Sequence, residues 1–292
     1  EVETNEVREQ AFLAGKGKYA AQQDNFSKIP GAPVAYWVGQ SFIRPYTTNV
    51  PLLGDEAAPC AGLATGDNDR FQRYWYEIQH SDIAFDCLET ASTKYRSEKW
   101  YPCNSGGEFR KWYPTDVIVV NWYHDGQEIK AYRNAAGKLG ARPQNTQWYF
   151  KEGFTWNKLS ASKFAVRYKR AGFIFDDTSR SAFPHDSELL YYYIGILCSC
   201  VAFDYLQALD PTMSFTNGDL VRIPLVVDKK RKANVEQIVQ SNICSSKDDW
   251  DANELSWDFQ RHPLVTPAID QHYMLLQTSD LFYISSSAPP CS

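Results

Sequence analysis

The chain has 292 residues and a formal net charge of −5 at pH 7, and 43% of its residues are hydrophobic. This composition excludes a chain that is disordered as a whole, and the length allows one large domain or two small ones. The longest apolar run, residues 189–209, is interrupted by Ser199, Asp204 and Gln207. Because a membrane span needs about 18 apolar residues in sequence, this run is predicted to be a buried helix that ends at Asp210-Pro211.

Residues 1–4 have neither the basic start nor the apolar core of a signal peptide, and we expect the chain to be a piece of a longer protein. The seven cysteines are irregularly spaced, without a CxxC pair or a Cys/His cluster, which argues against a zinc site. Reduced thiols in a cytoplasmic protein are the simplest interpretation.

The first sixty residues are predicted to be mainly helical. Residues 1–23 contain few helix breakers except Gly15 and Gly17, and the apolar run 34–40 leads into a second helix. Residues 49–59 contain two prolines and an acidic pair, which indicates a loop. We place a domain boundary in this loop.

Short strands are predicted beyond this boundary. The β-prone runs 117–123 and 128–132 flank Asp125-Gly126. Because Asp-Gly between such runs is a good hairpin signal, a hairpin is predicted over 117–132. Further strands are predicted at 154–156, 164–168 and 172–175.

A basic stretch lies inside this acidic chain. Residues 94–170 hold 15 lysines or arginines against 6 aspartates or glutamates, a net charge of +9, so the remainder carries −14. Such a stretch is typical of a surface that binds a polyanion, although a solvated basic face on an ordinary domain fits the composition equally well. Its Asn, Gln and aromatic residues suit base reading and stacking. For four tryptophans core packing is the favoured interpretation: Trp75, Trp100, Trp122 and Trp148.

Two enzyme classes, methyltransferases and Mg²⁺-dependent nucleases, carry recognisable motifs. The sequence contains neither the glycine-rich turn that binds S-adenosylmethionine nor an Asn-Pro-Pro-Tyr type loop, so we expect no methyl transfer by this chain alone. Asp116, Glu128 and Lys130 superficially match a Mg²⁺-dependent nuclease. In the predicted hairpin, however, Asp116 and Glu128 would lie roughly 23 Å apart. Ligands of Mg²⁺ sit at about 2.1 Å from the ion, so the nuclease remains only an alternative.

The segment GLATGDNDRF, residues 62–71, resembles the GLxTGDNDRF segment of the PglX family. These are the adenine-specific DNA methyltransferases of BREX phage-defence systems, and they are similar to type IIG restriction-modification enzymes. The matches together span roughly residues 26–264. Further matching segments follow in order at residues 99–113, 120–126, 142–146, 150–158, 172–176 and 250–264.

The resemblance implies a position in a larger enzyme. In that family a methyltransferase domain comes first and a target recognition domain follows, and this chain resembles the second part. Residues 189–224 are also similar to the end of a type I specificity-subunit recognition domain. The expected fold is therefore α+β, a mixed-sheet recognition module with flanking helices. The expected divisions are 1–58 (end of the methyltransferase domain or connector), 59–227 (recognition domain), 228–264 (helical segment) and 265–292 (poorly ordered tail).

The implied function is recognition of double-stranded DNA for an adenine-N6 methyltransferase. S-adenosylmethionine would belong to the full-length enzyme and not to this chain. Expected partners are DNA, the methyltransferase domain and other defence subunits, with no membrane. A protein-interaction domain that binds an acidic partner is the second alternative.

Residue types then indicate which side chains contact DNA. Side chains that pair with base edges are expected to read sequence, and cations are expected to contact phosphates. For Asp67 and Asp69, hydrogen bonds from the side chain to the backbone of their own loop are as good an explanation as contact with DNA. The candidates for base reading are Asn68, Arg70, Gln144 and Asn145, those for phosphate contacts are Arg110, Lys111, Arg142, Lys158, Lys163 and Arg167, and Thr65 is a further DNA-binding candidate.

Overall fold

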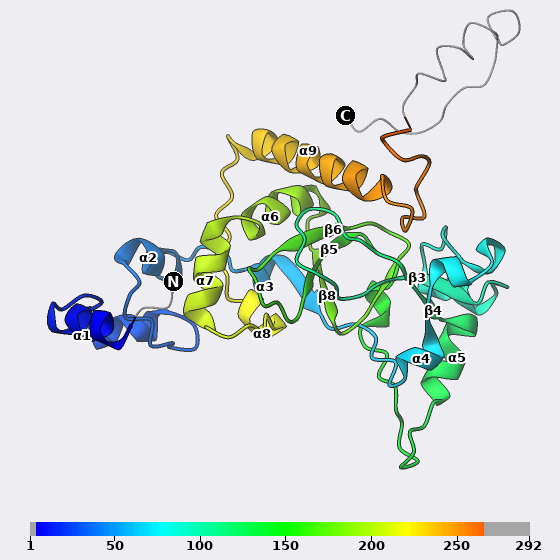
Figure 1. Cartoon of the computed structure of the whole chain (residues 1–292), viewed down its shortest axis with the longest axis horizontal. Coiled ribbons are helices and arrows are strands. Elements are labelled where there is room, and N and C mark those ends of the chain that lie inside the picture. Colours follow the sequence, from blue (N-terminus) through cyan, green and yellow to red (C-terminus); the bar gives the residue numbers. More distant parts are fainter. Residues whose placement is uncertain (1–3, 266–292) are drawn as a thin grey trace, which may run out of the picture.

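A computed structural model describes residues 4–265 as two four-stranded sheets surrounded by helices (Figure 1). The strands are β1 (Ala57–Cys60), β2 (Gln72–Tyr74), β3 (Trp100–Asn104), β4 (Ile118–Asn121), β5 (Gly153–Asn157), β6 (Val166–Lys169), β7 (Ile174–Phe175) and β8 (Ser179–Pro184). The first sheet has the order β1-β8-β5-β6 and is antiparallel throughout. The second has the order β2-β4-β3-β7, with β3 and β7 parallel. The predicted α+β class is confirmed.

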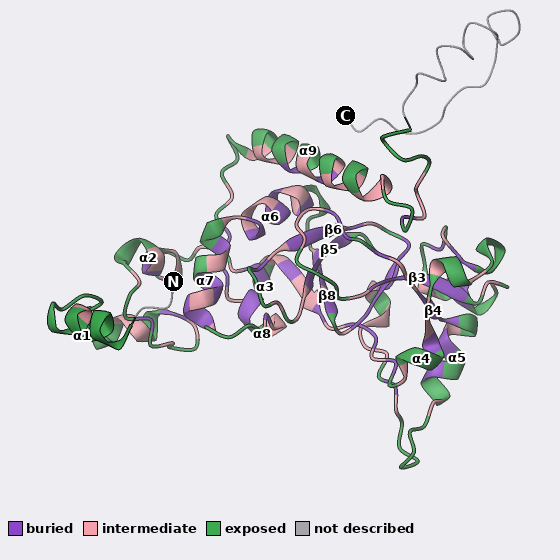
Figure 2. Cartoon of the chain, viewed as in Figure 1, coloured by how far each residue is buried: buried purple, intermediate pink, exposed green. Residues whose placement is uncertain are grey.

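Helices cover the first sheet. They are α6 (Leu190–Leu197), α7 (Cys200–Leu209) and α9 (Lys232–Asp251). α6 lies between the sheet and α9, which explains why it is apolar on all sides, with Tyr193 and Ile194 fully buried. At Gly195 a Cβ atom would lie 2.9 Å from Val239, so glycine permits the close approach of α9. Figure 2 shows the exposed outer side of α9.

A second core lies around the second sheet and reaches Phe183 on β8 of the first. Trp122 and Tyr149 are fully buried in it, with their rings 5.2 Å apart. Trp148 stacks on Phe183 at 4.7 Å. Trp100 is also buried, so the predicted core packing is confirmed for these three tryptophans.

The remaining elements are short. They are the helices α1 (Asn5–Leu13), α2 (Gln40–Thr47), α3 (Leu53–Glu56), α4 (Asn68–Phe71), α5 (Tyr123–Ala131) and α8 (Asn217–Leu220), and the 3₁₀ turns Gln23–Lys28, Trp75–Glu77, His80–Asp82, Thr90–Lys94, Thr146–Trp148 and Ser187–Leu189. α1 has no buried residue, and with α2 it forms an arm at one end of the molecule (Figure 1).

Two helix predictions need correction. The helix expected over 1–23 ends at Leu13, because Gly15 and Gly17 adopt left-handed φ angles of +71° and +78°. The helix expected over 189–209 is two helices bent by 76°. Ser199 causes the break, since its hydroxyl accepts a hydrogen bond from the Ala202 backbone N–H and caps α7.

The hairpin predicted over 117–132 is wrong. β4 is followed directly by α5, so Glu128 lies on a helix rather than on a second strand. The turn signal did mark a left-handed segment, with φ of +47°, +59° and +68° at His124, Asp125 and Gly126. The chain then enters a helix whose Ile129 is buried in the second core. The strands expected near 154–156, 164–168 and 172–175 and the helix after residue 40 are confirmed.

Residues 50–57 pair with distant segments, because the Leu53 N–H donates to the Ile223 carbonyl at 2.8 Å and Ala57 pairs with Pro184. The predicted domain boundaries near residues 58 and 227 therefore lie close to the place where the segment around Leu53 contacts the segment around Ile223. From residue 266 onward the tail expected over 265–292 lies outside the described residues. Between residues 4 and 265, no single helix has the length and apolarity of a membrane span; the bent α6–α7 pair meets that criterion only as a pair. None of the six described cysteines forms a disulfide bond.

Candidate nucleic-acid interface

The cations of residues 94–170 do not form one continuous face. Arg167 and Lys169 are buried, at 4% and 0% exposure. The Lys111 Nζ donates to the Cys198 carbonyl at 2.7 Å and so anchors its segment at the break between α6 and α7. Arg170 pairs with Asp258 at 3.0 Å. Several of the cations that make up the +9 charge are therefore buried or bonded within the fold.

The GLATGDNDRF segment forms a loop after β1 that leads into α4. The Asp67 carboxylate accepts a hydrogen bond from the Arg70 N–H at 3.1 Å and caps α4, which is the loop-holding role considered for it. Thr65 is buried and its hydroxyl bonds to Asn68. Arg70 forms an ion pair with Glu128 at 2.8 Å. Asn68 and Asp69 remain exposed.

This loop borders a hollow with a volume of about 670 Å³. Its other side is formed by Tyr132 and residues 176–178. Among the described residues, its only charged lining residues are the four aspartates Asp67, Asp69, Asp176 and Asp177. Since carboxylates repel phosphate and accept hydrogen bonds from base amino groups, the hollow suits base edges better than a DNA backbone.

Gln144 and Asn145 hold a loop against the same segment. The Asn145 Nδ2 donates to the Ala61 carbonyl at 2.9 Å, and the Gln144 Nε2 donates to the Gly62 carbonyl at 3.4 Å. Arg142 and Ala64 exchange two backbone hydrogen bonds, of 2.7 and 3.1 Å. The Arg142 side chain is exposed beside the hollow-lining loop. The two amides thus have a positioning role, whereas Arg142 is free to meet a ligand.

We expect Asn145→Ala to destabilise the protein by about 2 kcal/mol. The change removes the bond to Ala61, a loss of about 1 kcal/mol, and places alanine at a left-handed φ of +54°, which costs about 1 kcal/mol more. Asn145→Gly should lose only about half as much, since glycine tolerates this backbone conformation. Urea unfolding measures both variants. Equal losses of unfolding free energy in the two variants would contradict the predicted cost of alanine at this left-handed φ.

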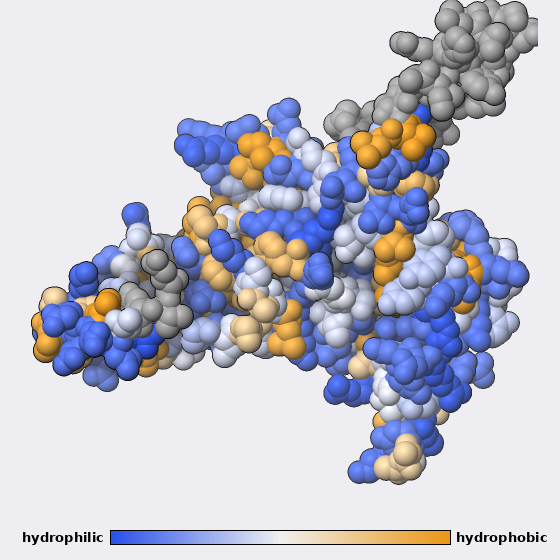
Figure 3. Space-filling model, in the orientation of Figure 1, coloured by the Kyte–Doolittle hydropathy of each residue, from blue (hydrophilic) through white to orange (hydrophobic). Residues whose placement is uncertain are grey.

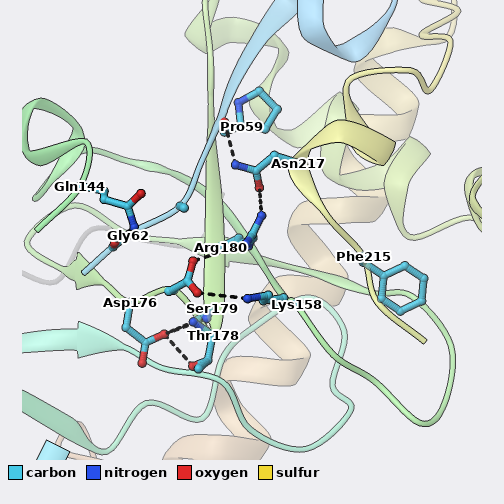
Figure 4. A network of polar contacts seen from close by, with 12 residues as sticks. Pro59, Gly62, Gln144, Lys158, Asp176, Thr178, Ser179, Arg180, Phe215 and Asn217 are labelled. Carbon is cyan, nitrogen blue, oxygen red and sulfur yellow. Dashed lines mark hydrogen bonds and ion pairs between the residues drawn. The ribbon is translucent and has the colours of Figure 1, made fainter. Parts of the chain in front are cut away.

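Lys158 belongs to a chain of polar contacts that joins β1, β8 and α8 (Figure 4). Its Nζ pairs with Asp177 at 3.2 Å, and Asp177 also pairs with Arg180 at 3.4 Å. Arg180 donates to the Asn217 side chain, which in turn donates to the Pro59 carbonyl, both at 3.2 Å. This network was not predicted from the sequence. The one sequence feature that could have indicated the network is the turn-forming series Asp176-Asp177-Thr178-Ser179. In this turn the Asp176 carboxylate accepts hydrogen bonds from the Thr178 and Ser179 N–H groups.

Three candidate phosphate-contacting residues come together at a small crevice of about 10 Å³ next to Phe215. They are Arg110, Lys163 and Arg167, which lie apart in the sequence. The crevice contrasts with the large hollow because cations line it.

The nuclease arrangement does not form. Asp116 is buried and accepts a hydrogen bond from the Asn104 Nδ2 at 2.6 Å. Glu128 instead bonds to Arg70 and Asn121, and Lys130 pairs with Asp125. In the part of the chain that the structure describes, no group of three acidic, His or Cys side chains could hold a metal ion.

Gly15, Gly17, Gly62 and Gly66 do not form an open glycine-rich turn after a strand. Gly62 and Gly66 follow β1, but a Cβ atom there would lie 2.0 Å from the Phe175 carbonyl oxygen and 2.3 Å from that of Gly140. Their backbones are therefore packed against other chain segments instead of being open to a cofactor. Gly15 and Gly17 follow a helix and not a strand.

No protein-family model matches the sequence. The chain is 33% identical over 277 residues to the adenine-specific methyltransferase PglX of Lacticaseibacillus casei (strain Zhang), covering 92% of this chain and 23% of that protein. It is 33% identical over 246 residues to the adenine-specific methyltransferase BrxX of Escherichia coli O9:H4 (strain HS), covering 83% of this chain and 19% of that protein. The predicted resemblance is confirmed: this chain is homologous to a part, less than a quarter in length, of PglX-family adenine-specific methyltransferases.

Proposed function

We propose that this chain is the DNA target recognition module of an adenine-specific methyltransferase. The observation that carries the proposal is the 33% identity along 92% of the chain to one part of such an enzyme. The sequence contains no Asn-Pro-Pro-Tyr loop, and Gly62 and Gly66, which follow β1, are closely packed, which supports a role outside catalysis. Methyl transfer from S-adenosylmethionine would be carried out by another part of the parent protein.

The hollow and the neighbouring Arg142 suit different contacts with DNA. The acidic hollow next to residues 64–69 offers carboxylates and the exposed Asn68, which can pair with base edges. The exposed Arg142 stands beside it and is suited to a phosphate or a guanine. Figure 3 shows that hydrophilic residues cover the part of the surface around α4 and α5.

Duplex DNA binding at increasing salt tests the proposal. We expect weak binding whose logarithm falls linearly with the logarithm of salt concentration, because phosphate contacts release counterions. Arg142→Glu should weaken binding and flatten the slope by about one. Lys230→Glu makes the same charge change at an exposed lysine in the segment before α9 and should leave the slope unchanged. Absence of DNA binding, together with binding to an acidic protein, would favour the interaction-domain alternative.

A further inference from the structure

Arg167 is a buried cation with neutral hydrogen-bond partners. It lies on β6, and its Nη2 donates to the Asn157 Oδ1 at 2.7 Å and to the Ser179 Oγ at 3.4 Å. Its buried Nε has no hydrogen-bond partner, and no carboxylate of residues 4–265 forms an ion pair with it. Because an uncompensated buried charge is costly, buried cations are normally paired with an anion. Asp116 and Asp176 attract Arg167 electrostatically, but neither forms an ion pair with it, so the Arg167 Nε remains available to an anion that enters from outside.

Two further cations line the same crevice. Arg110 pairs with Asp249 through Nη2 at 2.7 Å, but its buried Nε is also without a partner. Lys163 is exposed at the rim, and no ion pair is found for it within the described chain. Three cations therefore line one crevice, and among them only Arg110 has an ion pair with a carboxylate of residues 4–265.

The size of the crevice limits what can enter. A volume of about 10 Å³ holds an atom group of roughly the size of one water molecule. A complete phosphate ion does not fit inside, whereas one oxygen of a phosphate group does, with the rest of the group outside near Lys163.

We propose that this crevice binds a non-bridging oxygen of a DNA phosphodiester, with Arg167 and Arg110 at its base and Lys163 at its rim. This inference rests on the proposed function and adds to it a specific contact with the DNA backbone.

The position of the crevice favours DNA over a free anion. Asn157, which lines the crevice, donates to the Gly107 carbonyl at 2.6 Å, and the Gly106 N–H donates to the Thr178 hydroxyl at 2.8 Å. Thr178 in turn lines the large acidic hollow. One short segment therefore connects the two sites. Lys158 also links them, because the Phe215 N–H donates to the Lys158 carbonyl at 2.8 Å and the Lys158 N–H donates to the Thr178 carbonyl at 2.9 Å. A duplex with its bases at the hollow would bring its backbone to the crevice.

The first test is DNA binding by the Lys163→Glu variant. Lys163 is exposed, so the variant should fold, and we expect the log–log salt slope to flatten by about one relative to the wild-type chain. Lys230→Glu is the matched control. If the wild-type chain binds DNA and both variants bind with the unchanged slope, the crevice assignment is overturned while the proposed function stands.

The second test does not depend on DNA. Melting temperatures are compared in inorganic phosphate and in chloride at equal ionic strength. Phosphate stabilises proteins in general, so all variants should gain a common increment. We expect the wild-type chain to gain more than Lys163→Glu and Arg167→Met do. An equal gain for all three overturns the site. Failure of the wild-type chain to bind DNA would instead overturn the proposed function, and with it the DNA assignment of the crevice.

Discussion

Replacing Gly62 by alanine is expected to destabilise the protein by about 3 kcal/mol or more. A Cβ atom at this position would lie 2.0 Å from the Phe175 carbonyl oxygen and 2.6 Å from the Phe175 ring. That oxygen also accepts a hydrogen bond from the Leu63 N–H at 2.9 Å. The clash is with backbone, which cannot move aside as a flexible side chain would. Relief therefore requires β7 to separate from the loop that borders the acidic hollow.

Gly107→Ala is the matched control, because no heavy atom lies within 4 Å of a Cβ atom built there. Urea unfolding of the two variants should show a large loss of unfolding free energy for Gly62→Ala and a small change for Gly107→Ala. Salt-dependent DNA binding by Gly62→Ala should also fall, since the hollow-lining loop is displaced. Equal stabilities of the two variants would contradict the close packing of Gly62 on Phe175.

The sequence predicted the fold class and two strands of the first sheet, β5 and β6, but not β1, which begins in the predicted loop 49–59, or β8. Phe154, Trp156 and Val166 are apolar and fully buried, so local composition and tertiary environment agree. The break between α6 and α7 was harder to predict. Ser199 was recognised as an interruption of the apolar run, but only the cap on Ala202 shows that it starts a new helix.

The failed hairpin has a physical explanation. Asp-Gly predicts positive φ, and the chain does adopt it, but positive φ is also compatible with entry into a helix. Packing decides between the two, because Gly126 lies against the Trp122 ring and Ile129 is buried. Charge counting has a similar limit. It includes Arg167 and Lys169 in a basic stretch, yet cannot show that the fold buries both.

The buried Asp116 is predicted to lower stability at neutral and alkaline pH. Burial raises its pKa from 3.8 to about 7, and this desolvation outweighs the attraction of Arg167 and the hydrogen bond from Asn104. Arg170 and Lys169 also attract the carboxylate, more weakly. The native protein consequently favours the protonated carboxyl group.

The direction of the pH effect follows from proton binding. Between about pH 4 and pH 7 the native state holds a proton on Asp116 that the unfolded state has released, so stability falls as pH rises through this range. Burial lowers the pKa of Lys169 to about 7, so its contribution has the opposite slope above that pH. The two contributions can therefore be separated by the pH range in which each appears.

Asp116→Asn should remove the first contribution, because the amide remains uncharged and keeps an acceptor for Asn104. We expect the variant to match the wild-type protein near pH 4 and to exceed its unfolding free energy by up to about 4 kcal/mol above pH 7, as the shift from 3.8 to about 7 implies. Urea unfolding from pH 4 to pH 8 measures this difference. Asp24→Asn, at an exposed carboxylate of the N-terminal arm, is the control and should show no such trend. A constant difference between Asp116→Asn and the wild-type protein across this range would mean that the Asp116 carboxyl does not titrate differently in the folded and unfolded states.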